Sequence, residues 1–346
     1  MVEKPSFWRR HWKLILNIIT IVALVGLAYA IRGDLVDTLE NLKRVNGWAL
    51  LLMLPIQVLN YHGQTMLYQG MFAIVGNKLS YKFLFKASLE LNFVNHVFPS
   101  GGAAGISYFA LRIKNGDITA AKATLIQIMK LALTFLSFEL LLIIGMICLA
   151  VMGQVSNLTI LVGTAISTLL LVGTFLFVYI VESKSRINHT FIAVTKGLNK
   201  LIHVVRRNHP ETISLDKARP VFNDFHDNYK QLRQSLPQLK SSFWWALVIN
   251  ATEILSIYVV FLAFGHNVNI GAIILAYGVA NFAGLISVLP GGVGVYEFLM
   301  TAVLATAGVP ASVSIPVIIM YRVLNTLIQV PPGYYLYQKN LVKSKS

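Results

Sequence analysis

The sequence predicts an all-α, polytopic integral membrane protein: a helical bundle with two broken, re-entrant helical hairpins related by an inverted repeat. Three observations predict this class. Of the 346 residues, 56% are hydrophobic and only 12% are charged, which is too little polar surface for a soluble domain. Long apolar segments recur along the chain. Two of them are interrupted by proline and glycine, at Pro99–Gly105 and Pro290–Gly294. In lipid, such a break must be buried in protein or line a wet cavity.

The first half of the predicted single membrane domain covers residues 14–181. Around its break, Phe83–Phe98 and Ala103–Ile113 rise about 24 Å and about 17 Å, so neither crosses a hydrocarbon core of about 30 Å comfortably. We therefore expect these two segments to form a re-entrant hairpin. For Leu14–Ile31 an uncleaved span is expected, with a secretory signal peptide as the alternative. The predicted spans of this half are Leu14–Ile31, Trp48–Val75, Ala120–Met152 and Leu158–Val181.

The second half covers residues 241–337 and repeats this order. Phe243–Gly265 is a span, Ile270–Leu289 and Val295–Ala307 flank the second break, and Val313–Tyr337 is the last span. Ile270–Leu289 is long enough to cross the membrane by itself, so its re-entrant or spanning character stays open.

A polar segment, residues 182–240, separates the halves. It contains eleven Lys and Arg against five Asp and Glu, and apolar residues recur in it at helical spacing. This pattern predicts two amphipathic helices on the cytoplasmic surface. They would pack on the bundle as a solvated linker, anchor on anionic headgroups, or bind a protein partner.

Positive charge predicts the orientation. The net charge is +15, and Lys and Arg are concentrated near both termini and in the polar segment. Cytoplasmic loops of membrane proteins carry this excess, so both termini are expected in the cytoplasm and the protein in the plasma (inner) membrane. The first hairpin then enters from inside and the second from outside, as an inverted repeat requires. Nucleic-acid binding is disfavoured, because no soluble domain carries the charge.

Charged and polar residues within the apolar segments are the candidate site. Lys130 and Arg322 lie about 15 Å into their spans, where a charge is expensive and faces the bundle interior. They are expected to attract a lipid phosphate or to neutralise Glu297 and Glu90. The N-terminus of the helix after the second break would present unpaired N–H groups to a phosphate. The predicted substrate-binding residues are Glu90, Asn92, Gly101, Gly102, Gly105, Lys130, Asn281, Pro290, Gly291, Gly292, Gly294, Glu297 and Arg322.

These motifs resemble a known family. Asn281-Phe282 followed by Pro290-Gly-Gly-Val-Gly-Val-Tyr-Glu297 is similar to the signature of the lysylphosphatidylglycerol synthase transmembrane-region family, also called flippase-like domain proteins. Asn92 and Pro99–Gly105 resemble its first Gly-Gly motif, although Ile106 and Ser107 stand where an acidic residue is common. The resemblance covers roughly Trp12 to Tyr337. It implies a membrane module associated with lipid translocation, without the soluble aminoacyl-transferase domain.

The sequence therefore predicts a flippase-like or scramblase-like transporter of a phospholipid or lipid-linked headgroup. The expected partner is a membrane lipid, most simply an anionic phospholipid. A transporter is favoured over an enzyme, and no catalytic residue, metal or cofactor is predicted. The alternatives are an integral membrane transferase acting on a lipid, with Glu297 or His96 as base, and a non-catalytic partner in envelope assembly. The oligomeric state stays open.

Overall fold

The computed structural model describes residues 22, 25–26, 29, 32–43, 45–98, 103–114, 118–153, 156–190, 192–193, 229–230, 233, 235–286 and 294–343. In these residues, all regular secondary structure is helical, which confirms the all-α class. The helices of the first half are α2 (Arg32–Leu42), α3 (Gly47–Leu51), α4 (Met53–Ile74), α5 (Tyr81–Val97), α6 (Ala103–Ile113), α7 (Ala120–Val151) and α8 (Asn157–Val181). The second half has η1 (Leu236–Gln238), α11 (Leu239–Ala263), α12 (Ile270–Ile286), α13 (Val295–Thr306) and α14 (Ala311–Lys343).

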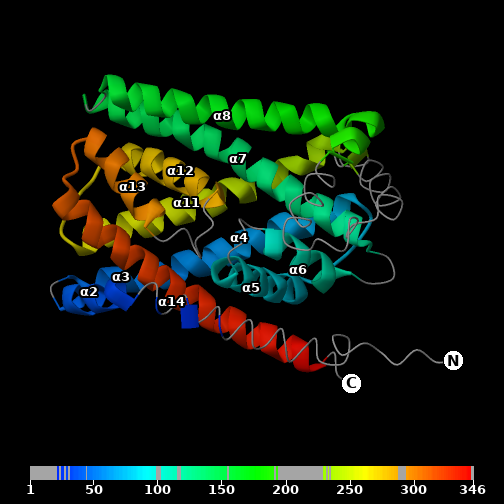
Figure 1. The fold of residues 1–346 in the computed structure, drawn as a ribbon, viewed down its shortest axis with the longest axis horizontal. Helices are drawn as coiled ribbons and strands as arrows, with labels where there is room; N and C mark the ends of the chain where they lie inside the picture. Colours follow the sequence, from blue (N-terminus) through cyan, green and yellow to red (C-terminus); the bar gives the residue numbers. More distant parts are fainter. Residues whose placement is uncertain are drawn as a thin grey trace, which may run out of the picture.

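Long helices dominate the bundle (Figure 1). Among the described residues, four stretches are long and apolar enough to cross a membrane: Ala120–Val151, Asn157–Ile180, Leu239–Ala263 and Ala311–Asn340. Helix α4 has 22 residues, a spanning length, but it carries buried Gln57, Asn60 and Gln64 on its inner face. It packs along α11, whose own Asn250 and Ser256 are buried. The bundle interior is therefore polar between α4 and α11, although the surface is apolar.

The two ends of the bundle can be defined by contacts between helix termini. At one end, Lys122 Nζ donates to Asn77 Oδ1 over 3.0 Å, which joins the start of α7 to the end of α4. We call this the Asn77 end. At the other, Asn269 Nδ2 donates to the Cys148 carbonyl over 3.4 Å, which joins the start of α12 to the end of α7. We call this the Asn269 end. Thr306 lies there too, because its carbonyl accepts from Thr159 Oγ1 at the start of α8.

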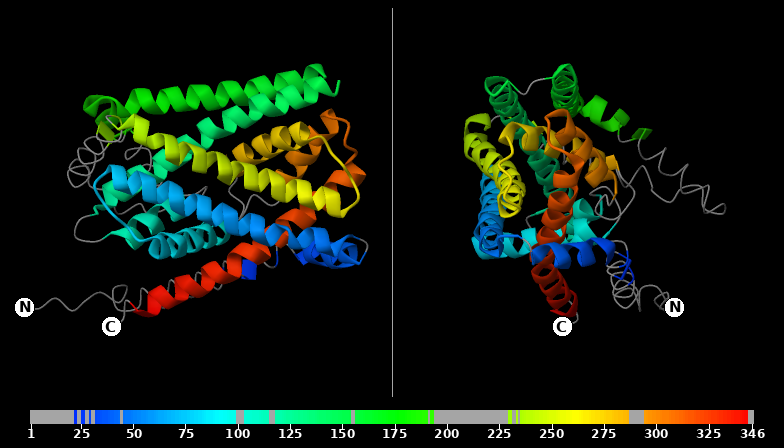
Figure 2. Two further views of the ribbon diagram at one scale, coloured as in Figure 1. Left: turned by 180° about the vertical axis from the view of Figure 1, so that it is seen from behind. Right: turned by 90° about the vertical axis from the view of Figure 1, so that its left-hand side faces the viewer.

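The two pairs of short helices open toward different ends. Helix α5 begins and α6 finishes beside the Asn77 end, whereas α12 begins and α13 finishes at the Asn269 end. Within each pair the two helices pack on one another. The α5–α6 and α12–α13 pairs accordingly occupy opposite halves of the bundle in Figure 1 and in the reversed view of Figure 2.

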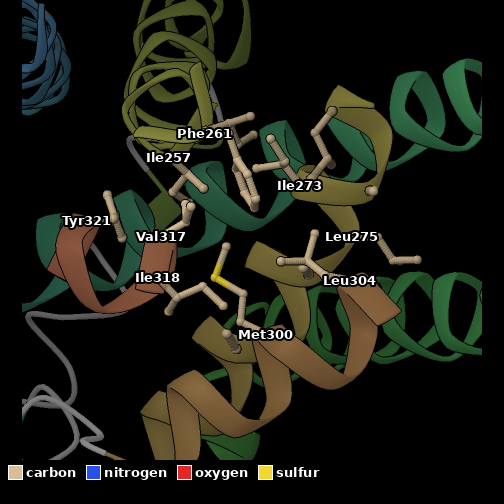
Figure 3. Close-up of a cluster of buried hydrophobic side chains, with 14 of the residues drawn as sticks. Ile257, Phe261, Ile273, Leu275, Met300, Leu304, Val317, Ile318 and Tyr321 are labelled. Atoms are coloured by element: carbon tan, nitrogen blue, oxygen red, sulfur yellow. The ribbon is translucent and has the colours of Figure 1, made fainter. Parts of the chain in front are cut away.

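The largest hydrophobic cluster among the described residues lies toward the Asn269 end, and α11, α12, α13 and α14 supply most of its side chains. Ile257 and Phe261 of α11 meet α12, α13 and α14 there (Figure 3). Met300, Leu304, Val317 and Ile318 are fully buried in this cluster. Within a membrane such helices associate through close van der Waals packing rather than through removal of apolar surface from water, so this packed core fixes the α12–α13 pair against α14.

Glycines set the closest helix approaches. A Cβ on Gly333 of α14 would lie 2.6 Å from the Leu89 carbonyl oxygen of α5. A Cβ on Gly105 of α6 would overlap the Asn95 side chain of α5. Helices approach this closely in membranes where small residues face the partner. Helix α5 is therefore held between α6 and α14.

One predicted loop is a helix. The expected spans Leu14–Ile31 and Trp48–Val75 leave a charged connection between them, and residues 32–42 of that connection form α2, which packs on α14. Leu and Val recur at helical spacing in this stretch, and no proline interrupts it. Most of the expected span Leu14–Ile31 and of the polar segment lies outside the described residues. Within the polar segment, residues 184–190 are helical.

Candidate functional site

The α12–α13 pair carries an ion pair within the bundle. Arg322 of α14 donates from Nη1 to Glu297 Oε1 of α13, and the exposed fractions of the two side chains are 18% and 15%. The Arg322 guanidinium also lies 4.9 Å from the centre of the Tyr296 ring. This ion pair is one of the two roles expected for Arg322, and the other, attraction of a lipid phosphate, stays a prediction. Both members of this pair keep some accessible surface.

Glu297 also caps the start of its own helix, α13. Its Oε2 accepts a hydrogen bond of 2.7 Å from the backbone N–H of Gly294, which precedes α13. Gly294 has φ +86°, a left-handed conformation that glycine adopts without strain. The end of the second glycine motif therefore orients the carboxylate, and the carboxylate already occupies one of the N–H groups expected to face a phosphate.

The α5–α6 pair carries a different ion pair. Glu90 of α5 is fully buried, and its Oε2 accepts from Arg112 Nε over 2.7 Å and from Tyr108 Oη over 2.6 Å. Its Oε1 accepts from Asn340 Nδ2 of α14. Arg112 and Tyr108 both belong to α6, so this carboxylate connects three helices. Three donors around one acid, one of them charged, leave it little room for another ligand.

A polar chain connects the two halves between these pairs. Lys130 Nζ of α7 donates to Gln64 Oε1 over 3.3 Å, and Gln64 Nε2 donates to Asn60 Oδ1 over 2.7 Å. Asn60 Nδ2 donates to Glu253 Oε1 of α11 over 3.1 Å. Glu253 Oε2 accepts from Tyr321 Oη of α14 over 2.8 Å. The chain thus runs through α7, α4, α11 and α14.

Helix α14 contacts every acid in this set. Its side chains Tyr321, Arg322 and Asn340 donate to Glu253, Glu297 and Glu90, respectively. Arg322 and Asn340 are separated by eighteen residues, about 27 Å along a helix. His96, at the end of α5, lies within electrostatic range of Arg322. The broken end of the first pair and the start of α13 therefore approach the same guanidinium.

The predicted role of Lys130 needs correction. It was expected to attract a lipid phosphate or to neutralise Glu90 and Glu297. The structure shows neither acid at its ammonium, which binds Gln64 and lies 5.1 Å from the Tyr68 ring centre. Glu90 is neutralised by Arg112 of α6 instead. Spacing along the sequence cannot identify such partners, because each lies on a different helix.

The other predicted residues are dispersed. Asn92 accepts from His96 Nδ1 through its carbonyl over 2.9 Å. Asn281 is exposed and donates to the Tyr277 carbonyl over 3.0 Å. Gly105 packs against Asn95 and lines no cavity that the structure shows. Gly101, Gly102, Pro290, Gly291 and Gly292 lie outside the described residues.

A cavity of about 180 Å³ lies between α7, α11 and α12. Asn250, Tyr277 and Asn281 supply its polar groups, and Phe135 and Phe138 much of its apolar lining. No group of three or more His, Cys, Asp or Glu side chains within the described ranges could hold a metal ion. Asn60, Gln64 and Glu253 interrupt apolar segments, but the sequence does not indicate that they contact one another or that Tyr321 and Asn340 are donors.

Comparison of the sequence with known proteins identifies the family of this chain. Two proteins called UPF0104 membrane proteins are similar. One, from Methanothermobacter thermautotrophicus, is 23% identical over 324 residues, which cover 91% of this chain and 92% of that protein. The other, from Pyrococcus horikoshii, is 23% identical over 146 residues, 40% of this chain and 44% of that protein. The family profile of the lysylphosphatidylglycerol synthase TM region matches residues 14–333. This chain is therefore a multi-pass membrane protein that belongs to the lysylphosphatidylglycerol synthase transmembrane-region family.

Proposed function

We propose that this protein moves the headgroup of a phospholipid, or of another lipid-linked substrate, across the plasma membrane as a flippase-like or scramblase-like transporter. The headgroup passes along the Arg322–Glu297 pair and the second glycine motif, while the acyl chains stay in the bilayer. The substrate chemistry that fits a guanidinium best is an anionic phosphate, which Arg binds through two parallel N–H groups. The supporting observation is an accessible ion pair between α13 and α14, beside the glycine at φ +86°.

The arrangement of the short helices supports this route. We propose that α5–α6 and α12–α13 are re-entrant hairpins of an inverted repeat, with α5–α6 entering from the cytoplasm. The pairs open toward the Asn77 and Asn269 ends, respectively, and Arg322 interacts with groups near both breaks. With both termini in the cytoplasm, the Asn77 end is the cytoplasmic one. Substrate sites of repeat transporters lie where such broken helices meet.

A change of partner at Arg322 explains how the site works. In the structure Glu297 occupies the guanidinium and one N–H at the start of α13. An incoming phosphate replaces Glu297 on Arg322. The carboxylate then keeps its bond to Gly294, or binds the amine of a zwitterionic headgroup. Partial exposure of both side chains makes this exchange cheaper than at a fully buried pair, where an unpaired charge costs several kcal/mol.

The test is lipid movement in vesicles that contain the purified protein and a fluorescent anionic phospholipid. Arg322→Ala and Glu297→Gln each remove one member of the ion pair on the proposed route. Each is expected to slow lipid movement about tenfold or more, which corresponds to a loss of about 1.4 kcal/mol or more of stabilisation. Arg322→Lys keeps the charge but not the planar fork, so it is expected to be intermediate.

Arg233→Ala is the matched control. Arg233 forms a 2.6 Å ion pair with Glu182, but the two side chains are 56% and 38% exposed and lie in the polar segment. This variant removes an ion pair of the same type away from the proposed route, and it is expected to leave movement unchanged. If Arg322→Ala moves lipid as fast as Arg233→Ala does, the proposed route is wrong.

The polar segment, residues 182–240, is assigned a supporting role. Its excess of six positive charges favours contact with anionic headgroups at the cytoplasmic surface. A protein partner would use the same surface. Deleting residues 194–228 should preserve some lipid movement if the bundle is the transporter, and should abolish it if the segment is the active part.

A further inference from the structure

Glu253 is a carboxylate deep in the bundle with no role in the proposed headgroup route. It lies fourteen residues into the 25-residue helix α11, about 21 Å from its start. Its Oε1 accepts from Asn60 and its Oε2 from Tyr321, over 3.1 Å and 2.8 Å. Both donors are neutral. At this depth an ionised carboxylate is costly unless it is paired with a cation or solvated.

The three acids that contact α14 differ in their charge partners. Glu90 binds Arg112 and Glu297 binds Arg322. Within the described residues, no cation lies in salt-bridge contact with Glu253. Lys130 reaches it only through the side-chain amides of Gln64 and Asn60. These amides are uncharged, so they form hydrogen bonds but cannot neutralise the carboxylate.

Tyrosines surround Glu253 on the sides where α4, α12, α13 and α14 approach it. Tyr277 and Tyr296 interact with it electrostatically, and Tyr321 bonds to it directly. Helix α3 and the turn η1, which also pack on α11, contain no titratable side chain. The titratable and charged groups that face Glu253 are Tyr61 of α4, Lys130 of α7 through the two amides, Tyr277 of α12, Tyr296 of α13, and Tyr321 with its neighbour Arg322 of α14.

The 180 Å³ cavity between α7, α11 and α12 lies near this region. Tyr277 lines it and also interacts with Glu253, and Asn250 lies on α11 one helical turn before Glu253. At about 30 Å³ for each water in the liquid, the volume corresponds to several water molecules. Glu253 itself is only partly buried. The cavity therefore offers water polar groups about one helical turn from Glu253, which is not itself a lining residue.

From this geometry we infer that Glu253 is a proton-binding site, reached through the α7–α11–α12 cavity, that couples a proton gradient to the proposed lipid movement. The ligand is the proton, delivered by water. One hydronium ion in the cavity transfers its proton to the carboxylate and leaves as water, and the carboxyl group becomes neutral. Release to the opposite side reverses the reaction, so no other reactant is needed. The inference of coupling rests on the proposed function, whereas proton binding does not.

Tyr321 and Arg322 connect the two sites. They are consecutive residues of α14, and they bind Glu253 and Glu297, respectively. Neutralising Glu253 weakens it as an acceptor for the Tyr321 hydroxyl, because hydrogen bonds to ionised groups are stronger than those to neutral ones. The electrostatic attraction that acts on the adjacent Arg322 guanidinium changes as well. The strength with which Arg322 binds Glu297 or a phosphate therefore changes.

Proton binding is tested by infrared difference spectroscopy of the purified protein in lipid nanodiscs during acidification. The wild type is expected to show the C=O band of a protonated carboxyl group, and Glu253→Gln to lose it. Tyr321→Phe is expected to retain the band at a shifted frequency, because it removes one donor. Glu139→Gln, which removes another acid of a membrane helix, should preserve the Glu253 band. Identical spectra for the wild type, Glu253→Gln and Tyr321→Phe would overturn the assignment.

Coupling is tested in vesicles with an imposed pH gradient. Wild-type lipid movement is expected to change severalfold with the direction of the gradient, and Glu253→Gln movement to be insensitive to it. If no lipid moves but the Glu253 band is present, the proposed function fails and the proton site stands. If lipid moves and no Glu253 band appears, or if Glu253→Gln responds to the gradient as the wild type does, the inference is wrong while the lipid route survives. Should Glu253→Gln fail to fold, the band shift of Tyr321→Phe decides.

Discussion

Each of the two pairs of short helices carries a Glu–Arg ion pair, but the two ion pairs differ in burial and in their other hydrogen bonds. Glu90 in the α5–α6 pair is fully buried and accepts from Arg112, Tyr108 and Asn340. Glu297 in the α12–α13 pair binds Arg322 and a backbone N–H, and both side chains remain partly exposed. Glu90, with donors on both carboxylate oxygens, holds its helices together. The Glu297–Arg322 pair is accessible and can exchange partners.

This difference separates stability from function within one bundle. The Glu90 cluster ties α5 and α6 to the far end of α14, and the Glu297 pair ties α13 to its middle. We therefore expect substitutions at the first site to lower the free energy of unfolding most. Substitutions at the second should affect lipid movement more than stability.

The largest expected effect is that of Arg112→Ala. It leaves the fully buried Glu90 carboxylate without its cation, and breaking a buried pair in this way typically costs about 3–5 kcal/mol. The midpoint of thermal unfolding in a fixed detergent measures it. Arg322→Ala, at the more exposed pair, should lower the midpoint less. Equal losses for the two variants would remove the distinction between the sites.

Tyr108→Phe sharpens the same comparison with a smaller change. It removes a 2.6 Å hydrogen bond to Glu90 and preserves the ring, which packs near Tyr337. A hydrogen bond to a charged group contributes about 1.5–3 kcal/mol, so a loss of that size is expected in the unfolding free energy. Lipid movement by the folded fraction should be unchanged. A selective loss of movement at full stability would show that the Glu90 site takes part in transport.

The fold and part of the site follow from the sequence. Apolar length located the four stretches long enough to cross a membrane and both pairs of short helices, because a crossing of the bilayer needs a minimum apolar length. The Arg322–Glu297 pair was also anticipated, since both residues are charged within apolar sequence. The partners of Glu90 and Lys130 were not. Arg112, Asn340 and Gln64 lie on other helices, and their contacts depend on how those helices are rotated, which a single sequence does not specify.

Helix spacing gives a third prediction. Gly333→Ala places a Cβ 2.6 Å from the backbone oxygen of Leu89, which cannot move aside easily, so α14 must shift away from α5. Overpacking of this kind costs about 1–3 kcal/mol. Gly173→Ala in α8 is the control, because its Cβ meets nothing within 4 Å. The control should be neutral or slightly stabilising, and a comparable loss in both variants would argue against close α5–α14 packing.

The smallest expected effect is at the surface. Arg233→Ala removes an ion pair whose members are 56% and 38% exposed, and such pairs contribute about 0–1 kcal/mol. Its unfolding midpoint should nearly match that of the wild type. A large loss would indicate that the polar segment is a structural part of the bundle.

The central claim is that the two short helix pairs enter the membrane from opposite faces, and sided cysteine labelling tests it most directly. After Cys148→Ser, a single cysteine is placed at exposed Lys114, beyond α6, or at exposed His266, before α12. A membrane-impermeant maleimide is expected to label His266→Cys in intact cells and Lys114→Cys only after permeabilisation. Labelling of both positions from the same side would contradict the claim.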